Sequence, residues 1–310
     1  MGAERILITG ANGQIGSDLA EALREQYGQD NVITTDLRAP AHPDAGPWDI
    51  LDVLDKKAIE EKFGKYRPTQ VYHLAAMLSA VAEQKPLAGW NLNMNSLLSI
   101  LQAAVDRGIS KVFWPSSIGA FGPGTPKDQT PQHTIMDPTT VYGISKKAGE
   151  GWCRYYFEKY GLDVRSIRYP GLISYKTKPG GGTTDYAIAI FHAAKKEQHY
   201  TSFLRADTEL PMMYMPDAIR GTLRLMDAPA ESLRIRSSYN FAGLSFTPSE
   251  LAAAIRKLIP GFRIDYKPDF RQAIADSWPH SIDDSYARED WGWQAAYDLD
   301  RMAADMLAHI

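Results

Sequence analysis

Residues 5–16, Arg5-Ile6-Leu7-Ile8-Thr9-Gly10-Ala11-Asn12-Gly13-Gln14-Ile15-Gly16, decide the fold of this chain. The run from Arg5 to Thr9 is apolar and β-branched, which predicts a buried strand. Apolar residues recur at helical spacing after Gly13, so we expect a helix to follow the glycine turn directly. Strand, glycine-rich turn and helix, in that order, are the context that a dinucleotide-binding fingerprint requires.

The three glycines of this turn have separate expected roles. Gly10 permits the tight turn, Gly13 lets the backbone approach a pyrophosphate, and Gly16 lets the helix pack close to the strand. The helix then presents free N–H groups and a positive dipole end to the phosphates. The spacing is G-x-x-G-x-x-G, and an ordinary turn between a strand and a helix would also fit it.

The second expected strand, residues 31–36, ends in an acid twenty residues after Gly16. A carboxylate at this place accepts both adenosine ribose hydroxyls and repels a 2′-phosphate, so Asp36 favours NAD over NADP. Arg38 would weaken that preference by offering the phosphate a partner. The alternative role of Asp36 is that of a turn residue at the end of a strand.

Length and composition indicate a globular protein without a nucleic-acid or membrane partner. The 310 residues suffice for one large α/β domain, or for a nucleotide domain with a smaller partner. A net charge of −3 gives no reason to expect nucleic acid or an anionic membrane. No apolar run approaches the ~20 residues that span a bilayer, and the first strand begins too early for a signal peptide. We therefore expect a cytoplasmic protein.

The cysteine count excludes two kinds of site. Cys153 is the single cysteine of the chain, so neither an intramolecular disulfide nor a cysteine-built metal site is expected. Its surroundings, residues 152–157, are typical of a packed helix, which predicts a position in the core. No spacing typical of metal ligands occurs, so we expect no metal.

The order of the elements predicts the fold class. Strands and helices alternate from Arg5 to about Arg168, which predicts an α/β protein with a Rossmann-type, doubly wound parallel sheet. After residue 170 the pattern is less regular. We expect residues 1–170 to form an NAD-binding domain and residues 171–310 mainly a smaller C-terminal α/β substrate-binding region, with some segments returning to the first domain. The later elements that we expect are a strand at residues 210–214 and helices at residues 216–226, 249–259 and 298–310.

Small and polar residues follow the expected strands at the edge where ligands bind in open α/β sheets. Asp52 follows a short strand, where it could meet the adenine amino group or cap the next helix. The small residues of Leu74-Ala75-Ala76 leave space for a cofactor, whereas His73 is expected to be a strand residue with a satisfied ring. Ser116 and Ser117 end the fifth strand, where hydroxyls can bind a ligand or simply form a turn.

A tyrosine and a lysine share one face of a long helix that we expect to begin at Val141. A free phenol has a pKa of about 10 and is not a base at neutral pH. An ammonium a few Å away favours the phenolate and lowers that pKa. Tyr142 and Lys146 thus form a workable acid/base pair, with Ser117 hydrogen-bonded to the reacting oxygen. Taken alone, such a pair is also common on helix surfaces.

Residues 178–186, Lys-Pro-Gly-Gly-Gly-Thr-Thr-Asp-Tyr, combine consecutive glycines with two hydroxyls. The N–H groups of consecutive glycines can form an anion nest. The stretch therefore indicates a carboxylate-binding lid, although a flexible loop with Asp185 as a helix cap explains it equally well. A second loop, residues 278–285, could cover a pocket.

Together these motifs resemble the extended short-chain dehydrogenase/reductase family over essentially the whole chain. Residues 115–122, 168–175, 179–186 and 210–217 look like the short-chain L-threonine 3-dehydrogenases in particular. The resemblance implies NAD-dependent oxidation of the β-hydroxyl of L-threonine to 2-amino-3-oxobutanoate without a metal. It also implies a homodimer built from two helices of each subunit, residues 86–107 and 141–160.

The resemblance implies roles for individual residues. Tyr142 would be the general base, and Lys146 would hold the nicotinamide ribose and lower the tyrosine pKa. Ser117 would orient the substrate hydroxyl, and Asn95 would belong to the proton-relay helix of the family. The residues expected to contact the cofactor are Gly10, Asn12, Gly13, Gln14, Ile15, Gly16, Asp36, Asp52, Leu74, Ala75, Ala76, Asn95, Tyr142, Lys146 and Tyr169. The residues expected to contact the substrate are Ser79, Ser117, Tyr142, Gly182, Thr183 and Thr184.

Two other functions stay open at this point. A nucleotide-sugar epimerase or dehydratase would use the same serine, tyrosine and lysine, but it needs a larger pocket and contacts for a diphosphate. A non-catalytic NAD-binding module would have no need of Ser117, Tyr142 and Lys146 together.

Overall fold

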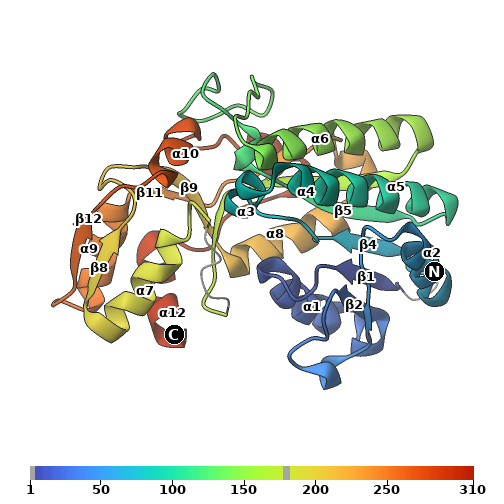
Figure 1. Ribbon diagram of the computed structural model, residues 1–310, viewed down its shortest axis with the longest axis horizontal. Coiled ribbons are helices and arrows are strands. Elements are labelled where there is room, and N and C mark those ends of the chain that lie inside the picture. Colours follow the sequence, from blue (N-terminus) through green and yellow to red (C-terminus); the bar gives the residue numbers. More distant parts are fainter. Residues whose placement is uncertain (1–3, 177–181) are drawn as a thin grey trace.

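A seven-stranded parallel sheet is the centre of the fold (Figure 1). The structure is a computed structural model that describes residues 4–176 and 182–310. The strands lie in the order β10-β6-β5-β4-β1-β2-β3, and every neighbouring pair is parallel. Their bounds are β1 (Ile6–Thr9), β2 (Val32–Asp36), β3 (Trp48–Ile50), β4 (Gln70–His73), β5 (Lys111–Ser117), β6 (Asp163–Tyr169) and β10 (Tyr239–Asn240). The predicted Rossmann-type α/β fold is thereby confirmed.

Helices cover both faces of this sheet. On one face lie α1 (Gln14–Tyr27), α8 (Met215–Asp227) and α11 (Ser285–Trp291). On the other lie α2 (Lys56–Tyr66), α5 (Ser96–Asp106) and α6 (Val141–Tyr160). Figure 1 shows α1 and α6 on opposite sides of the strands. The sheet is therefore wound on both faces, as the alternation of strands and helices predicts.

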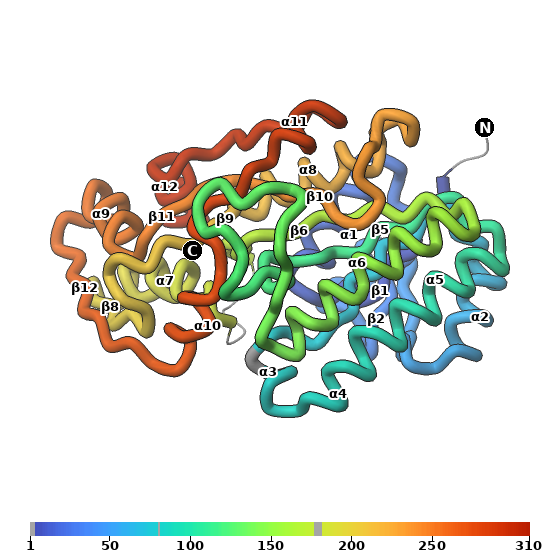
Figure 2. The backbone as a smooth tube through the Cα atoms, turned by 90° about the horizontal axis from the view of Figure 1, so that it is seen from above, coloured from blue at the N-terminus to red at the C-terminus, as the bar shows by residue number. Residues whose placement is uncertain are grey.

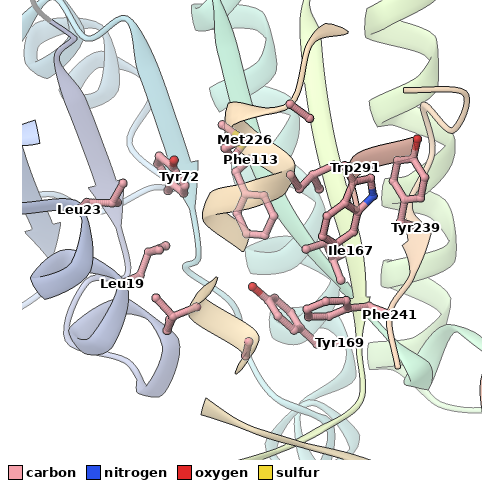
Figure 3. Close-up of a cluster of buried hydrophobic side chains, with 14 of the residues drawn as sticks. Leu19, Leu23, Tyr72, Phe113, Ile167, Tyr169, Met226, Tyr239, Phe241 and Trp291 are labelled. Carbon is pink, nitrogen blue, oxygen red and sulfur yellow. The ribbon is translucent and has the colours of Figure 1, made fainter. Parts of the chain in front are cut away.

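Alternation of side chains along the strands explains these two layers. On β1, Ile6 and Ile8 belong to the core under α1 and α8, whereas Leu7 belongs to the core under α2 and α5. On β5, Phe113 likewise faces the first core and Val112 the second. Successive side chains of a strand point to opposite faces, so a continuous apolar strand feeds two cores at once. Figure 3 shows part of the first core, including Phe113.

One predicted helix is interrupted by a wider turn. The segment expected as a single helix over residues 86–107 consists of α4 (Pro86–Trp90), a π-helical turn (Asn91–Asn95) and α5. A short helix, α3 (Ser79–Gln84), precedes it. Because a π-helical turn contains an extra residue, it changes which side chains face the sheet, and such turns are frequent at functional sites.

A second region lies at the other end of the long axis (Figure 2). It contains a three-stranded sheet of β7 (Gly171–Ile173), β9 (Leu210–Tyr214) and β11 (Leu244–Phe246). Its core is formed with α7 (Tyr186–Glu197), α9 (Pro248–Leu258) and α12 (Leu299–His309). The Thr247 side chain caps α9, because it accepts a hydrogen bond from Glu250 N.

The short strands β7 and β11 of this region have no counterpart in the sequence prediction. The helix α10 (Arg271–Ser277) and the parallel strands β8 (His199–Ser202) and β12 (Arg263–Tyr266) have none either. The two strands are short and polar and lie at the surface, so they carry no alternation that would reveal them. Conversely α8, β10 and α11, all beyond residue 170, pack on the large sheet. The division at residue 170 stays a prediction.

Candidate active site

One cavity lies at the carboxyl ends of β1, β4, β5 and β6, where open α/β sheets bind their ligands. The cavity is lined by the glycine turn, by the two serines at the end of β5, by the start of α6 and by residues of the second region. Most of the predicted site residues line it. They are Gly10, Gly13, Gln14, Ile15, Gly16, Leu74, Ala76, Ser79, Ser117, Tyr142, Lys146, Tyr169, Gly182, Thr183 and Thr184.

The glycine turn forms a cradle that tolerates no side chain. Gly10 has a φ of +70°, and a Cβ there would lie 2.6 Å from Ala75 N. A Cβ on Gly16 would lie 2.5 Å from Gly10 O, where α1 packs on the turn. Real Cβ atoms do not approach other atoms this closely, so both positions require glycine. Ala75, a predicted cofactor contact, does not line the cavity but supports Gly10 from behind.

The N-terminus of α1 faces the cavity with free donors. Its N-cap is Gly13, which provides no side-chain hydrogen bond to the first turn. The Gln14 Nε2 atom is buried and has no hydrogen-bond partner within the described part of the chain. A helix N-terminus with uncapped N–H groups binds phosphate well. The cradle and these donors fit the pyrophosphate of a dinucleotide.

Asp36 is held against the glycine turn. Its Oδ2 atom accepts a hydrogen bond from Asn12 N at 3.0 Å, and its Oδ1 atom accepts one from Leu37 N at 2.8 Å. The Asn12 side chain in turn donates to Arg38 O at 2.8 Å. Asn12 and Asp36 do not line the cavity, but both are bonded to the turn that does. Each carboxylate oxygen has a second lone pair for a ribose hydroxyl.

The chemistry-bearing side chains meet where α6 begins against the end of β5. The Thr140 side chain caps α6 by accepting from Gly143 N at 3.0 Å, so the helix starts at Val141 and places Tyr142 in its first turn. Tyr142 hydrogen-bonds with Ser117. Lys146 Nζ lies 5.4 Å from the centre of the Tyr142 ring and donates to Pro115 O at 2.5 Å.

Burial governs the protonation of this pair. It raises the pKa of the Tyr142 phenol, and the hydrogen bond with Ser117 offsets part of that rise. Burial also lowers the pKa of the Lys146 ammonium to about 7. That Lys146 lowers the tyrosine pKa stays a prediction. In the structure desolvation has the larger effect on Tyr142, and Lys146 Nζ donates to Pro115 O.

The rest of the cavity wall comes from α3 and from the second region. Ser79 begins α3, and Thr183 is buried just before α7. Asp185 stands at the N-cap position of α7, as predicted, but its carboxylate accepts from Gly182 N at 2.8 Å and makes no cap bond to the helix. Trp278, from the loop after α10, also lines the cavity, as expected of a covering loop. The first part of the predicted anion nest, residues 178–181, lies outside the described residues.

Residues 6–241 match the NAD dependent epimerase/dehydratase family. This chain belongs to that family. An uncharacterised epimerase/dehydratase of Staphylococcus haemolyticus is 49% identical over 99% of this chain and 98% of that protein. The family name and the cradle around Gly10 agree on NAD as the cofactor.

Several solved structures that resemble this chain over almost its whole length are named L-threonine dehydrogenase. A GalE-like L-threonine dehydrogenase from Cupriavidus necator, in its holo form, is 60% identical, with a TM-score of 0.97 over 98% of this chain and 99% of that chain. Its apo form superposes less well, with a TM-score of 0.86. A monomeric L-threonine 3-dehydrogenase from a metagenome database is 46% identical, with a TM-score of 0.95 over 98% and 97% of the two chains. The chain thus superposes better on the holo form than on the apo form of the Cupriavidus necator enzyme.

Asn95, one of the predicted cofactor contacts, lies outside the cavity wall. Asn95 is exposed and donates to Asn91 Oδ1 at 2.5 Å, so it cannot act in the cavity. Asn93 is buried instead, and its amide bonds to both Met77 N and Met77 O and to Ser145 Oγ. Helical spacing alone does not reveal Asn93, because the π-helical turn at residues 91–95 changes which side chains face inward.

Two further expected cofactor contacts have other roles in the described structure. Asp52 accepts from Leu54 N at 2.9 Å, away from the cavity wall, and the cap of α2 is Asp55. The Tyr169 ring lies in the core against Phe113, and its hydroxyl bonds to Thr222 (Figure 3). Tyr169 still lines the cavity, so its contact with the cofactor stays a prediction.

The remaining titratable residues near the site are structural, as predicted. The two ring nitrogens of His73 bond to Thr9 Oγ1 at 2.7 Å and Ser96 Oγ at 3.0 Å. Burial, followed by the charge of Lys146, lowers the pKa of His73 to about 3, so the ring is neutral. Cys153 is fully buried and fills the core.

Neither a metal-binding cluster nor a membrane-spanning helix is found in the described residues, 4–176 and 182–310. They contain no group of three or more His, Cys, Asp or Glu side chains that could hold a metal. None of the helices in this part of the chain is both long and apolar enough to cross a bilayer.

Proposed function

We propose that this protein oxidises the β-hydroxyl of L-threonine to a ketone, with NAD as hydride acceptor, and releases 2-amino-3-oxobutanoate. The observation that carries the proposal is that Ser117, Tyr142 and Lys146 line one cavity together with the glycine turn and residues 182–184. The comparisons support the substrate, since several solved structures that are 43–61% identical to this chain are named L-threonine dehydrogenase.

The cofactor would be held by the first domain. The glycine turn and the N-terminus of α1 bind the pyrophosphate, and Asp36 accepts the adenosine ribose hydroxyls. Lys146 holds the nicotinamide ribose. When bound, NAD supplies the hydride acceptor of the reaction. Because the reaction depends on this intracellular cofactor, we assign the enzyme to the cytoplasm.

Tyr142 acts as the general base in the proposed reaction. Its phenolate oxygen takes the proton of the substrate hydroxyl, while C3 gives up a hydride and the C–O bond becomes a carbonyl. Ser117 hydrogen-bonds the same oxygen and holds it in reactive geometry. In its charged form Lys146 favours the phenolate, which opposes the effect of burial on Tyr142.

The substrate backbone groups would be bound from the second region. We assign the carboxylate of L-threonine to the backbone and hydroxyl donors of Gly182, Thr183 and Thr184, and a further polar contact to Ser79. All four residues line the cavity. Trp278 and Leu78 add apolar surface, which suits the methyl group of a small amino acid.

A nucleotide-sugar epimerase is the competing function, and the cavity argues against it. A nucleoside diphosphate on the substrate side needs cations, yet Lys146 is the only Lys or Arg among the described residues of the cavity wall. We assign Lys146 to the cofactor. A binding module without catalysis would not need the serine, tyrosine and lysine together.

NADH absorbance on mixing the protein with NAD and L-threonine tests the proposal directly. We expect a rise with NAD and L-threonine that L-allo-threonine, L-serine and NADP do not produce at a comparable rate. A protein that ignores L-threonine but converts UDP-sugars and retains NAD through purification would be an epimerase. NAD binding without turnover of either substrate class would indicate the binding module.

We also propose a homodimer formed through α4 and α6. The two helices are in contact and carry exposed apolar side chains, among them Leu87, Trp90, Ile144 and Trp152. One relative is named monomeric, so light scattering after size exclusion is decisive. We expect the mass of two chains for the wild type and for the control Phe270→Glu, which alters an exposed apolar residue far from α6, and of one chain for Trp152→Glu. A single-chain wild type would contradict the dimer.

A further inference from the structure

Helix α6 carries a third polar side chain in line with the proposed catalytic pair. Tyr142, Lys146 and Glu150 follow one another at intervals of four residues, so they form one stripe on the helix. Glu150 is 4% exposed, so it lies with the other two on the buried side. The proposed reaction gives it no role.

The Glu150 carboxylate is fully engaged by two neighbouring strands. Ser116 Oγ donates to its Oε1 atom at 2.6 Å. Arg168, on β6, donates Nε to Oε1 at 2.9 Å and a second nitrogen to Oε2 at 2.8 Å. Hydrogen bonds to an ionised acceptor are about twice as strong as neutral ones, and the two-point Arg–carboxylate contact fixes geometry as well.

The stripe binds three consecutive residues at the end of β5. Tyr142 hydrogen-bonds with Ser117, Lys146 donates to Pro115 O, and Glu150 accepts from Ser116. Helix α6, which carries Tyr142, is therefore hydrogen-bonded at three successive residues to β5, which carries Ser117. Loosening one of these points would let Ser117 and Tyr142 change their separation.

Arg168 extends the same bonds toward the loop that contains Trp278. Another of its nitrogens donates to Gln132 O at 3.0 Å and to Asn240 Oδ1, on β10, at 2.8 Å. The side-chain amide of Asn240 then donates to Asp283 O, in that loop, at 2.9 Å. The charged pair is thus linked through Asn240 to the loop whose Trp278 lines the cavity.

We propose that Glu150 is a positioning residue that holds Ser117 and Tyr142 in reactive geometry through Ser116. The expected effect on kcat rests on the proposed function. The contacts that hold the two side chains in place do not depend on it. An ion pair that only stabilised the fold would lower stability on mutation without altering the chemical step.

Ser116→Ala is the sharpest test, because it removes one tie and leaves the Glu150–Arg168 pair intact. Ser166→Ala is the matched control: Ser166 is equally buried on β6 and bonds to Ser238 Oγ at 2.9 Å, not to Glu150. We expect Ser116→Ala to lower kcat on the order of tenfold to a hundredfold, since small displacements of reacting groups cost this much. The NAD dissociation constant should stay within about twofold, as expected when only the chemical step is affected.

Two readouts separate positioning from stability. With L-threonine deuterated at C3, the isotope effect on kcat should increase in Ser116→Ala, because hydride transfer becomes slower relative to product release. In the protein without ligands, hydrogen exchange of residues 117–120 and 141–146 should also accelerate. Ser166→Ala should change neither quantity, although both variants lower the melting temperature.

The outcomes are distinguishable. A wild type that does not oxidise L-threonine defeats the proposed function, and the exchange contrast between the two serine variants still decides the present inference. Equal exchange in Ser116→Ala and Ser166→Ala, or unchanged kcat and isotope effect in an active enzyme, would overturn it. Glu150→Gln is a second variant, whose kcat loss should be at least that of Ser116→Ala.

Discussion

Tyr142 is the residue on which the proposed chemistry depends most. Burial raises the pKa of its phenol and Ser117 lowers it, so little phenolate is present until a positive charge lies nearby. Tyr142→Phe removes only the hydroxyl. We expect kcat to fall by roughly 10²- to 10⁴-fold, the usual contribution of a general base, with little change in NAD affinity. Steady-state rates and NAD titrations check both.

A second tyrosine on the same helix supplies the control for that variant. Tyr155 is 43% exposed and far from the cavity wall, so Tyr155→Phe should leave kcat unchanged. If Tyr142→Phe kept a rate near that of the wild type, another group would have to be the base.

Lys146 makes stability depend on pH with a defined sign. Burial lowers its pKa from 10.5 to about 7, so between these values the unfolded chain binds more protons at this residue than the folded chain. The free energy of unfolding therefore rises with pH in this window because of Lys146. Urea unfolding at pH 6, 8 and 9.5 should show the wild type gaining stability relative to Lys146→Met as the pH increases. A difference that does not change with pH would exclude a low pKa for this lysine.

At the scale of elements, the π-helical turn at residues 91–95 places an amide under the cavity. Asn93 holds both backbone groups of Met77, in the segment between β4 and α3 that borders the cavity. Asn93→Ala leaves those groups unpaired, which we expect to cost about 1–3 kcal/mol of unfolding free energy. The same change should raise the KM for NAD, because the segment over the cavity loses its anchor. Denaturant unfolding and initial rates measure the two effects.

Asn95 is the matched control within the same turn. It is exposed, and within the described structure its side chain bonds only to Asn91, so Asn95→Ala should change stability by less than about 0.5 kcal/mol and leave the KM for NAD unaltered. A larger effect for Asn95 than for Asn93 would mean that the helix phase differs from the one described here.

The same element shows why part of the site could not be predicted. Helical periodicity places α5 and its apolar face correctly. Asn95, however, was assigned only from the family resemblance, and the π-helical turn at residues 91–95 leaves its side chain outside the cavity. The start of α6 was predictable, because Thr140 and the apolar pattern after it are local signals. The paired strands β8 and β12 were not, because their stability comes from the core beneath them.

At the scale of the whole molecule, the cofactor should stabilise the fold by mass action. A ligand at a hundred times its dissociation constant adds about 2.7 kcal/mol to the unfolding free energy when it binds only the folded state. We expect NAD to raise the melting temperature by several degrees in a thermal shift experiment. NADP should do so far less, because Asp36 lies where a 2′-phosphate would approach. Equal shifts with both nucleotides would remove Asp36 as the discriminating residue.

The sequence by itself determined the sheet, its two-sided winding, the glycine cradle and the serine–tyrosine–lysine set. These features follow from side-chain alternation, helical spacing and turn chemistry, which act over a few neighbouring residues. Only the tertiary structure decided that Asn93 replaces Asn95, that the Tyr169 ring lies in the core, and that Glu150 binds Ser116 and Arg168. It also decided the pKa directions of Tyr142 and Lys146, because burial depends on segments far apart in the chain.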